Sequence, residues 1–166
     1  MSGQSLKKLV VYYSLEGNTK FIAEVIADKI GAELLELKPQ TEINSRGFLK
    51  YFVGGRQSLF KQSPKLESLT KNPQDYDLLF IGTPVWAWNY APPLRSFFSS
   101  VKLSGKKIAL FCCCQGQKGK TFAEMRKALA GNEILGEKEF FNPLNNRNEN
   151  KKTAEEWAKQ IISLII

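Results

Sequence analysis

The clearest indication of the fold is the segment Leu9-Val10-Val11-Tyr12-Tyr13-Ser14-Leu15-Glu16-Gly17-Asn18-Thr19. Its first five residues are a continuous apolar run, which predicts a strand covered on both faces. The following residues are mostly small or polar, and apolar residues then recur at helical spacing up to a stop at Gly31. A buried strand that passes through a short loop into an amphipathic helix is the repeating unit of a parallel α/β sheet.

The rest of the chain repeats this alternation of strand and helix. Further strands are expected at Leu34–Leu37, Leu78–Gly82, Ile108–Cys113 and Ile134–Phe141. Helices are expected at Arg46–Phe60, from Pro92 to Val101 and at Thr121–Ala130. A capping box of Thr153 and Glu156 predicts the start of a last helix. The buried stripe of this helix is expected to consist of Trp157, Ile161, Leu164 and Ile165. Without a linker or internal repeat, residues 1–166 are predicted to form one doubly wound α/β domain.

Composition excludes several kinds of chemistry. The sequence has no histidine, which removes Ser–His and Cys–His nucleophiles and His-rich zinc sites. The three cysteines are consecutive, Cys112 to Cys114, so they have neither disulfide nor metal-site spacing, and no metal site is expected. They either end a buried strand as small apolar side chains, or place a thiol, Cys114 above all, beside a cofactor. No apolar run is long enough to cross a bilayer and no signal peptide is visible, so a cytoplasmic location is expected.

The formal net charge of +8 raises the question of a nucleic-acid partner. About half of this surplus lies between Glu42 and Lys71, where aromatic residues occur at spacings that suit the core face of a helix. Solvated basic side chains above a buried apolar stripe are the favoured interpretation. A cofactor-free basic binding module remains an alternative, but no recognition motif accompanies the charge, so nucleic acid is not the expected partner.

Three loops after predicted strands carry the candidate binding residues, because open α/β sheets bind ligands at the carboxyl ends of their strands. The first loop consists of Ser14, Leu15, Glu16, Gly17, Asn18 and Thr19. It leads into a helix start, where free N–H groups favour an anion such as phosphate. The spacing is neither that of a Walker P-loop nor G-x-G-x-x-G. The alternative is a simple helix cap, which Ser, Asn and Thr would serve equally well.

The second loop is rich in aromatic residues and the third in glycine. The second consists of Thr83, Pro84, Val85, Trp86, Ala87, Trp88, Asn89 and Tyr90. Its rings can stack on a planar heteroaromatic ligand or can cover an edge of the core. The third begins with Cys114, Gln115 and Gly116 and runs to Lys120, and its glycines permit a close backbone approach.

These motifs resemble those of the flavodoxin family. Val10-Val11-Tyr12-x-Ser14-x-x-Gly17-x-Thr19 is similar to the FMN phosphate-loop signature, and Gly82-Thr83-Pro84-Val85-Trp86 to the loop that packs against the isoalloxazine ring. The resemblance implies a five-stranded parallel sheet of order 2-1-3-4-5 with helices on both faces. It also implies FMN as the cofactor, with its phosphate in the first loop, Trp86, Trp88 and Tyr90 stacking on the ring, and the third loop along the pyrimidine edge.

Two departures from the family pattern stand out. Glu16 replaces the usual hydroxyl residue, so its carboxylate is expected to face solvent, and the chain is basic where classical members are acidic. The resemblance implies a redox protein that carries electrons between partners. Because the chain is basic, we expect an acidic surface on the partner, and no membrane partner is expected. The alternative is an NAD(P)H-dependent quinone or nitro-group reductase on the same fold. No general acid or base is assigned.

Overall fold

The computed structural model of the protein describes residues 5–41 and 63–166. Five parallel strands form one sheet in the order β2-β1-β3-β5-β6, and a short strand, β4, pairs antiparallel with the end of β3. Counting the parallel strands alone, this is the predicted order 2-1-3-4-5. The strands span Lys8–Tyr12 (β1), Glu33–Glu36 (β2), Leu78–Trp86 (β3), Asn89–Tyr90 (β4), Lys107–Cys114 (β5) and Glu133–Phe141 (β6).

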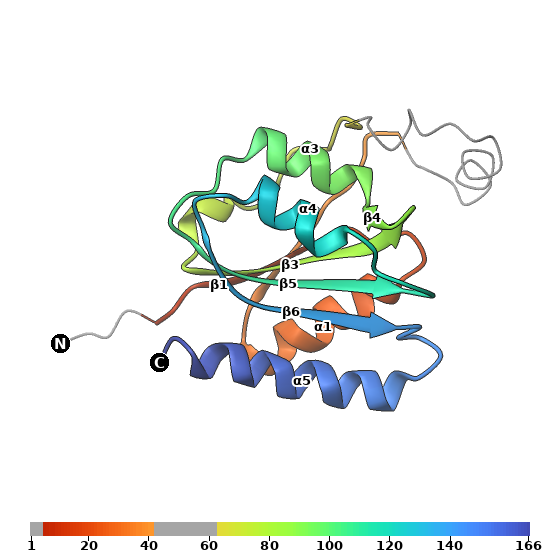
Figure 1. Ribbon diagram of the computed structural model, residues 1–166. Coiled ribbons are helices and arrows are strands. Elements are labelled where there is room, and N and C mark those ends of the chain that lie inside the picture. The colour runs from red at the N-terminus through yellow and green to blue at the C-terminus, as the bar shows by residue number, and fades with distance from the viewer. Residues whose placement is uncertain (1–4, 42–62) are drawn as a thin grey trace.

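Helices cover both faces of the sheet, as expected. Helices α1 and α5 lie on one side, and α3 and α4 lie on the other (Figure 1). Because side chains alternate along a strand, Val10 and Tyr12 of β1 pack toward α1 and α5, whereas Leu9 and Val11 pack toward α3 and α4. The helices span Asn18–Ile30 (α1), Pro92–Ser100 (α3), Thr121–Ala128 (α4) and Arg147–Ser163 (α5), with a 3₁₀ turn at Pro73–Asp75 (η2).

The last helix begins earlier than predicted. It starts at Arg147, so Thr153 lies inside α5 and does not cap it. Two contacts stabilise the added turn: the Arg147 guanidinium lies 4.6 Å from the ring centroid of Phe21, and the Asn150 side chain donates to the Asn146 carbonyl at 2.9 Å. The prediction of Leu164 in the buried stripe is also wrong, because it follows the end of α5 and is 62% exposed.

One predicted strand is longer in the structure, and one predicted helix lies outside the described residues. Strand β3 continues to Trp86, beyond the predicted end at Gly82, because Thr83 and Pro84 still pair with β5. The helix expected at Arg46–Phe60 falls outside the described residues. In the described part of the chain, no helix is long and apolar enough to cross a membrane.

Candidate functional site

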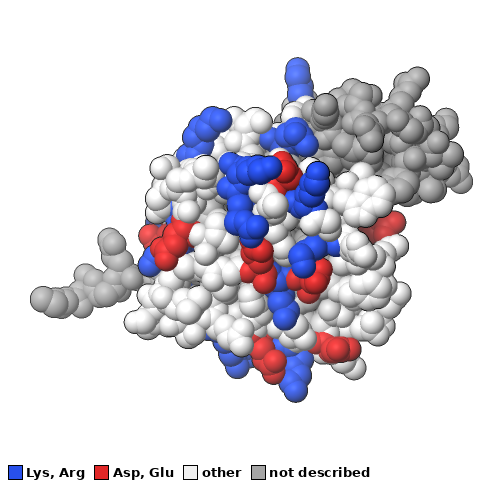
Figure 2. Space-filling model, in the orientation of Figure 1, with Lys and Arg blue, Asp and Glu red and all other residues white. Residues whose placement is uncertain are grey.

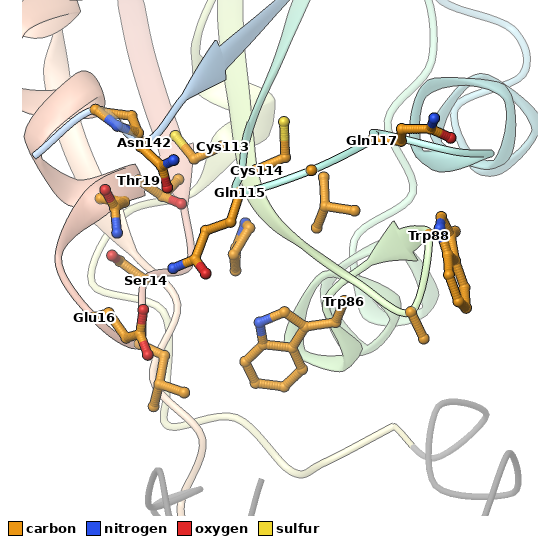
Figure 3. A pocket seen from close by; sticks show the side chains of 17 residues that line it. Ser14, Glu16, Thr19, Trp86, Trp88, Cys113, Cys114, Gln115, Gln117 and Asn142 are labelled. Atoms are coloured by element: carbon orange, nitrogen blue, oxygen red, sulfur yellow. The ribbon is translucent and has the colours of Figure 1, made fainter. Parts of the chain in front are cut away.

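A cavity of about 350 Å³ opens at the carboxyl ends of β1, β3 and β5. A volume of this size is at the small end of the range typical of cofactor sites. All three predicted loops contribute to it, and a fourth loop between β6 and α5 completes the wall (Figure 3). The predicted residues that line it are Ser14, Leu15, Glu16, Asn18, Thr19, Pro84, Val85, Trp86, Ala87, Trp88, Cys114, Gln115 and Gly116.

The first loop turns into α1 through Gly17. This residue has φ 93°, a left-handed conformation that favours glycine, and its N–H donates to Ser14 Oγ at 3.1 Å. Gly17 is itself not a lining residue, but its carbonyl accepts the N–H of Phe21 and so begins the helix. No side chain caps α1, and its first turn contains no acidic residue. The helix therefore presents free N–H groups to the cavity, as an anion site requires.

The polar side chains of this loop do not act as helix caps. Asn18 Oδ1 accepts the N–H of Leu144 at 3.2 Å, which ties the loop to the β6–α5 connection. Thr19 is 1% exposed, and its Oγ1 has no hydrogen-bond partner among the described residues. The nearby Cys113 sulfur is at best a weak acceptor for the Thr19 O–H, and this contact lowers the pKa of the Cys113 thiol slightly against the larger effect of burial. A buried hydroxyl without a strong partner costs free energy, which a ligand oxygen can recover.

The second loop is a β-hairpin. Val85 pairs with Tyr90 and Trp86 with Asn89, and the two turn residues, Ala87 and Trp88, have φ of 48° and 61°. Positive φ at both positions is the geometry of a type I′ turn, which non-glycine residues adopt at a cost.

The start of α4 holds this turn in place. The Lys120 N–H donates to the Trp88 carbonyl at 2.8 Å, and a Cβ on Gly119 would lie 2.7 Å from that same oxygen. Trp88 keeps 63% of its surface exposed, whereas Trp86 is nearly buried and packs edge-on against Tyr13 with ring centroids 5.6 Å apart. Two indoles of different exposure thus border the cavity (Figure 3).

Tyr90, Asn89 and Thr83 do not line the cavity. Tyr90 is buried and packs edge-on against Phe98, with centroids 5.4 Å apart. Thr83 is fully buried, and its hydroxyl donates to the Pro84 carbonyl at 2.8 Å and accepts the Ala91 N–H at 3.0 Å. Asn89 Oδ1 accepts the N–H of Tyr90. Because this segment is a paired hairpin, these side chains stabilise its base and leave the cavity to their neighbours.

All three cysteines lie in β5 and are buried, and Cys113 and Cys114 also reach the cavity. Their burial at the end of the strand agrees with the first interpretation, and the second, a thiol beside a cofactor, stays a prediction. Burial raises the pKa of the Cys114 thiol above its usual value and that of Cys113 to about 12. The thiols stay protonated at neutral pH and are weak nucleophiles there.

The lining residues Cys113, Asn142 and Pro143 lie outside the three predicted loops, and Gln117 lies within the third loop but was not singled out as a binding residue. Asn142-Pro143 follows the last strand, and such a dipeptide marks a turn. This turn at the carboxyl edge of the sheet could have indicated a fourth loop of the site. The Asn-rich stretch around it instead resembles an ordinary polar connection between a strand and a helix.

The cavity is nearly neutral although the protein is basic. Glu16 is the lining residue that carries a formal charge, and it is exposed, as expected. Lys and Arg side chains gather instead over α4, with acidic side chains among them (Figure 2). Several are paired there, including Lys118 with Glu139 at 3.3 Å and Arg126 with Glu137. No cluster of three potential metal ligands occurs within residues 5–41 and 63–166.

A doubly wound parallel sheet of this order, with its cavity at the carboxyl edge, defines the flavodoxin-like class of α/β proteins. The flavodoxin family model matches residues 7–161, and the chain therefore belongs to the flavodoxin family. No curated protein sequence gives a significant match.

Solved structures agree with this family. A flavoprotein in complex with FMN from Lactobacillus acidophilus is 25% identical and has a TM-score of 0.64, over 86% of this chain and 98% of that one. A provisionally assigned flavoprotein from Bacteroides eggerthii is 22% identical, with a TM-score of 0.77 over 95% and 99% of the two chains. Oxidised flavodoxin 1 from Bacillus cereus is 17% identical, with a TM-score of 0.59 over 96% and 99%. The last two show the fold alone.

Proposed function

We propose that this protein binds FMN in the cavity and carries electrons between redox partners. The observation that carries the proposal is that the two ends of the cavity differ in chemical character. One end has the free N–H groups of α1 and the buried, unpartnered hydroxyl of Thr19, and the other has Trp86 and Trp88 (Figure 3). A ligand with an anionic terminus and a planar ring matches both ends.

The residues present fit FMN. Neutral donors surround the phosphate end, and the single lining carboxylate, Glu16, is exposed to solvent. At the other end Trp86 is held by Tyr13 and can pack against a ring without losing much side-chain entropy. When bound, FMN supplies the redox chemistry, and the chain contributes placement, exclusion of water and electrostatics. The FMN-bound relative at 25% identity supports the same cofactor for this chain.

We also propose that the redox partner presents an acidic surface. The formal net charge of +8 favours encounter with an acidic protein. The interleaved acidic residues over α4 argue against a continuous basic surface of the kind that binds nucleic acid (Figure 2).

One observation favours a second candidate, an NAD(P)H-dependent reductase of quinones or nitro groups. Trp88 is 63% exposed, so the outer border of the cavity is not packed closed, and a second substrate can approach there. The purified FMN-loaded protein is tested in two assays: NADPH oxidation with a quinone and no added reductase, and electron transfer from a photoreduced sample to an oxidised redox protein. A carrier is active in the second assay alone. Rapid NADPH oxidation in the first assay would instead establish the reductase.

A further inference from the structure

Asn142 has an unusual backbone conformation at the edge of the cavity. Its φ is 42°, in the left-handed region, and the next residue is Pro143, which restricts its neighbour to extended conformations. Such strain persists only where surrounding contacts impose it, and it is concentrated at functional sites. Asn tolerates the left-handed region better than most residues do, but the proline makes the position costly even for Asn.

Backbone contacts hold this turn against the other loops of the site. The Asn142 N–H donates to the Cys114 carbonyl at 3.0 Å, and its own carbonyl accepts the N–H of Asn145, also at 3.0 Å. One residue beyond Pro143, the Leu144 N–H donates to Asn18 Oδ1 in the first loop. The turn is thus fixed both to the end of β5 and to the start of α1, so the point from which the Asn142 side chain leaves the backbone is fixed with it.

The carboxamide of Asn142 lies on the same side of the cavity as Thr19 and Cys113, away from Trp86 and Trp88 (Figure 3). It forms no hydrogen bond with another side chain or backbone group in the part of the chain that the structure describes. The hydroxyl of Thr19, 1% exposed, has no hydrogen-bond partner stronger than the Cys113 thiol. Two polar groups from separate elements, neither with a strong partner among the described residues, therefore border the same end of the cavity.

We infer that Asn142 is a specificity-determining residue, which donates a carboxamide N–H to the phosphate of the ligand beside the Thr19 hydroxyl. The inference rests on the proposed function and assigns part of its phosphate recognition to the β6–α5 turn. A neutral donor fits a site without a basic side chain, because it contacts the phosphate but adds no charge. The strained backbone is the cost of aiming this amide into the cavity.

Two substitutions separate the carboxamide from the backbone. Asn142→Gly keeps the left-handed conformation available but removes the amide. Asn142→Asp keeps the shape and replaces the donor with a carboxylate that repels phosphate. Asn145→Asp, at an exposed position in the same turn, is the control for the added charge. The affinities of the wild type and the variants for FMN and for riboflavin are measured by flavin fluorescence, together with the thermal midpoint of each apoprotein.

We expect Asn142→Gly to weaken FMN binding about tenfold or more, the effect of one hydrogen bond to a charged group, with riboflavin affinity unchanged. Asn142→Asp should weaken FMN binding further, and Asn145→Asp should leave it within about twofold, since an exposed charge is screened. Apoprotein midpoints should not fall in Asn142→Gly. Unchanged FMN affinity, or an equal loss for both flavins, would overturn the role of Asn142. Failure of the wild type to bind either flavin would overturn the proposed function and this inference with it.

Discussion

The hydroxyl of Thr19 illustrates how a single residue can favour binding over stability. It is buried without a hydrogen-bond partner in the described structure, so we expect Thr19→Val to raise the free energy of unfolding of the apoprotein by about 1 kcal/mol. The same change should weaken FMN binding by about 1–3 kcal/mol, because it removes a donor to a charged group. Urea unfolding of the apoprotein and an FMN titration measure the two effects.

Thr83→Val is the matched control for this prediction. Thr83 is equally buried, but its hydroxyl is bonded to the Pro84 carbonyl and the Ala91 N–H. Its loss leaves two buried groups unpaired and should destabilise the protein by about 1–3 kcal/mol. If the two valine variants change the free energy of unfolding in the same direction, the hydroxyl of Thr19 has a strong hydrogen-bond partner in the folded apoprotein.

Prediction from sequence was least accurate for the positions of single side chains. The strand–loop–helix pattern placed Thr19 and Trp86 at the cavity, because loops at the carboxyl ends of parallel strands meet at one edge. Tyr90 was expected at the ligand but packs against Phe98, because local sequence does not reveal which side chains of a paired hairpin turn toward the core. Asn142 was missed because its Asn-rich surroundings resemble an ordinary polar connection, and the backbone angle that places it depends on long-range contacts.

The contact between the aromatic hairpin and the start of α4 can be tested at Gly119. Its φ is 54°, and an added Cβ would overlap the backbone of Trp88. We expect Gly119→Ala to destabilise the protein by about 1–3 kcal/mol and to alter the near-UV circular dichroism of the tryptophans, because the hairpin tip must move.

Gly116→Ala serves as the control in the same loop. Gly116 has no positive φ, and an added Cβ would meet no atom within 4 Å. This substitution should change stability by less than about 0.5 kcal/mol. Equal effects of the two substitutions would show that the loop between β5 and α4 does not hold the hairpin as described.

Elements were predicted well where the apolar pattern was long and strong. The runs in β1, β3 and β5 are buried on both faces, so their composition alone indicated central parallel strands. The start of α5 was misplaced because its first turn, from Arg147, is polar and is stabilised by contacts with Phe21 in α1, which sequence spacing does not reveal. The hairpin strand β4 was missed because its turn residues, Ala87 and Trp88, are not the Asn or Gly typical of such turns.

For the molecule as a whole, stability should depend little on pH near neutrality and should fall in alkali. No histidine is present to titrate between pH 6 and 8. Burial raises the pKa of Cys113 from 9.0 to about 12, and that of Tyr12 and Tyr13 from 10.0 to about 12. A pKa raised in the folded state means that the unfolded chain loses its protons first, so stability is lost as pH rises from about 9 through 12.

Urea midpoints measured from pH 6 to pH 11 test this dependence. Cys113→Ala should make the decline above pH 9 shallower, because one raised thiol pKa no longer contributes. Midpoints that stay level up to pH 11, or that rise with pH, would contradict the burial of these groups.

The charge of the molecule leads to a prediction about electron transfer. If basic side chains near the cavity guide an acidic partner, the rate should fall as salt shortens the Debye length below about 10 Å. The Lys120 side chain is exposed beside Trp88, which only its backbone N–H contacts, so Lys120→Glu should slow association without changing FMN affinity. Lys159→Glu, exposed on α5 across the sheet, is the control for net charge. Stopped-flow rates that are equal for the two variants and insensitive to salt would contradict guided docking.

The proposed FMN site is tested by a calorimetric titration of the apoprotein with FMN and, separately, with riboflavin. We predict one FMN per chain and an affinity for FMN at least tenfold higher than for riboflavin, because the proposed contacts of the α1 N-terminus and Thr19 are with the phosphate, and both flavins share the ring. Equal affinities for the two flavins, or no heat of binding with FMN, would contradict the proposed site.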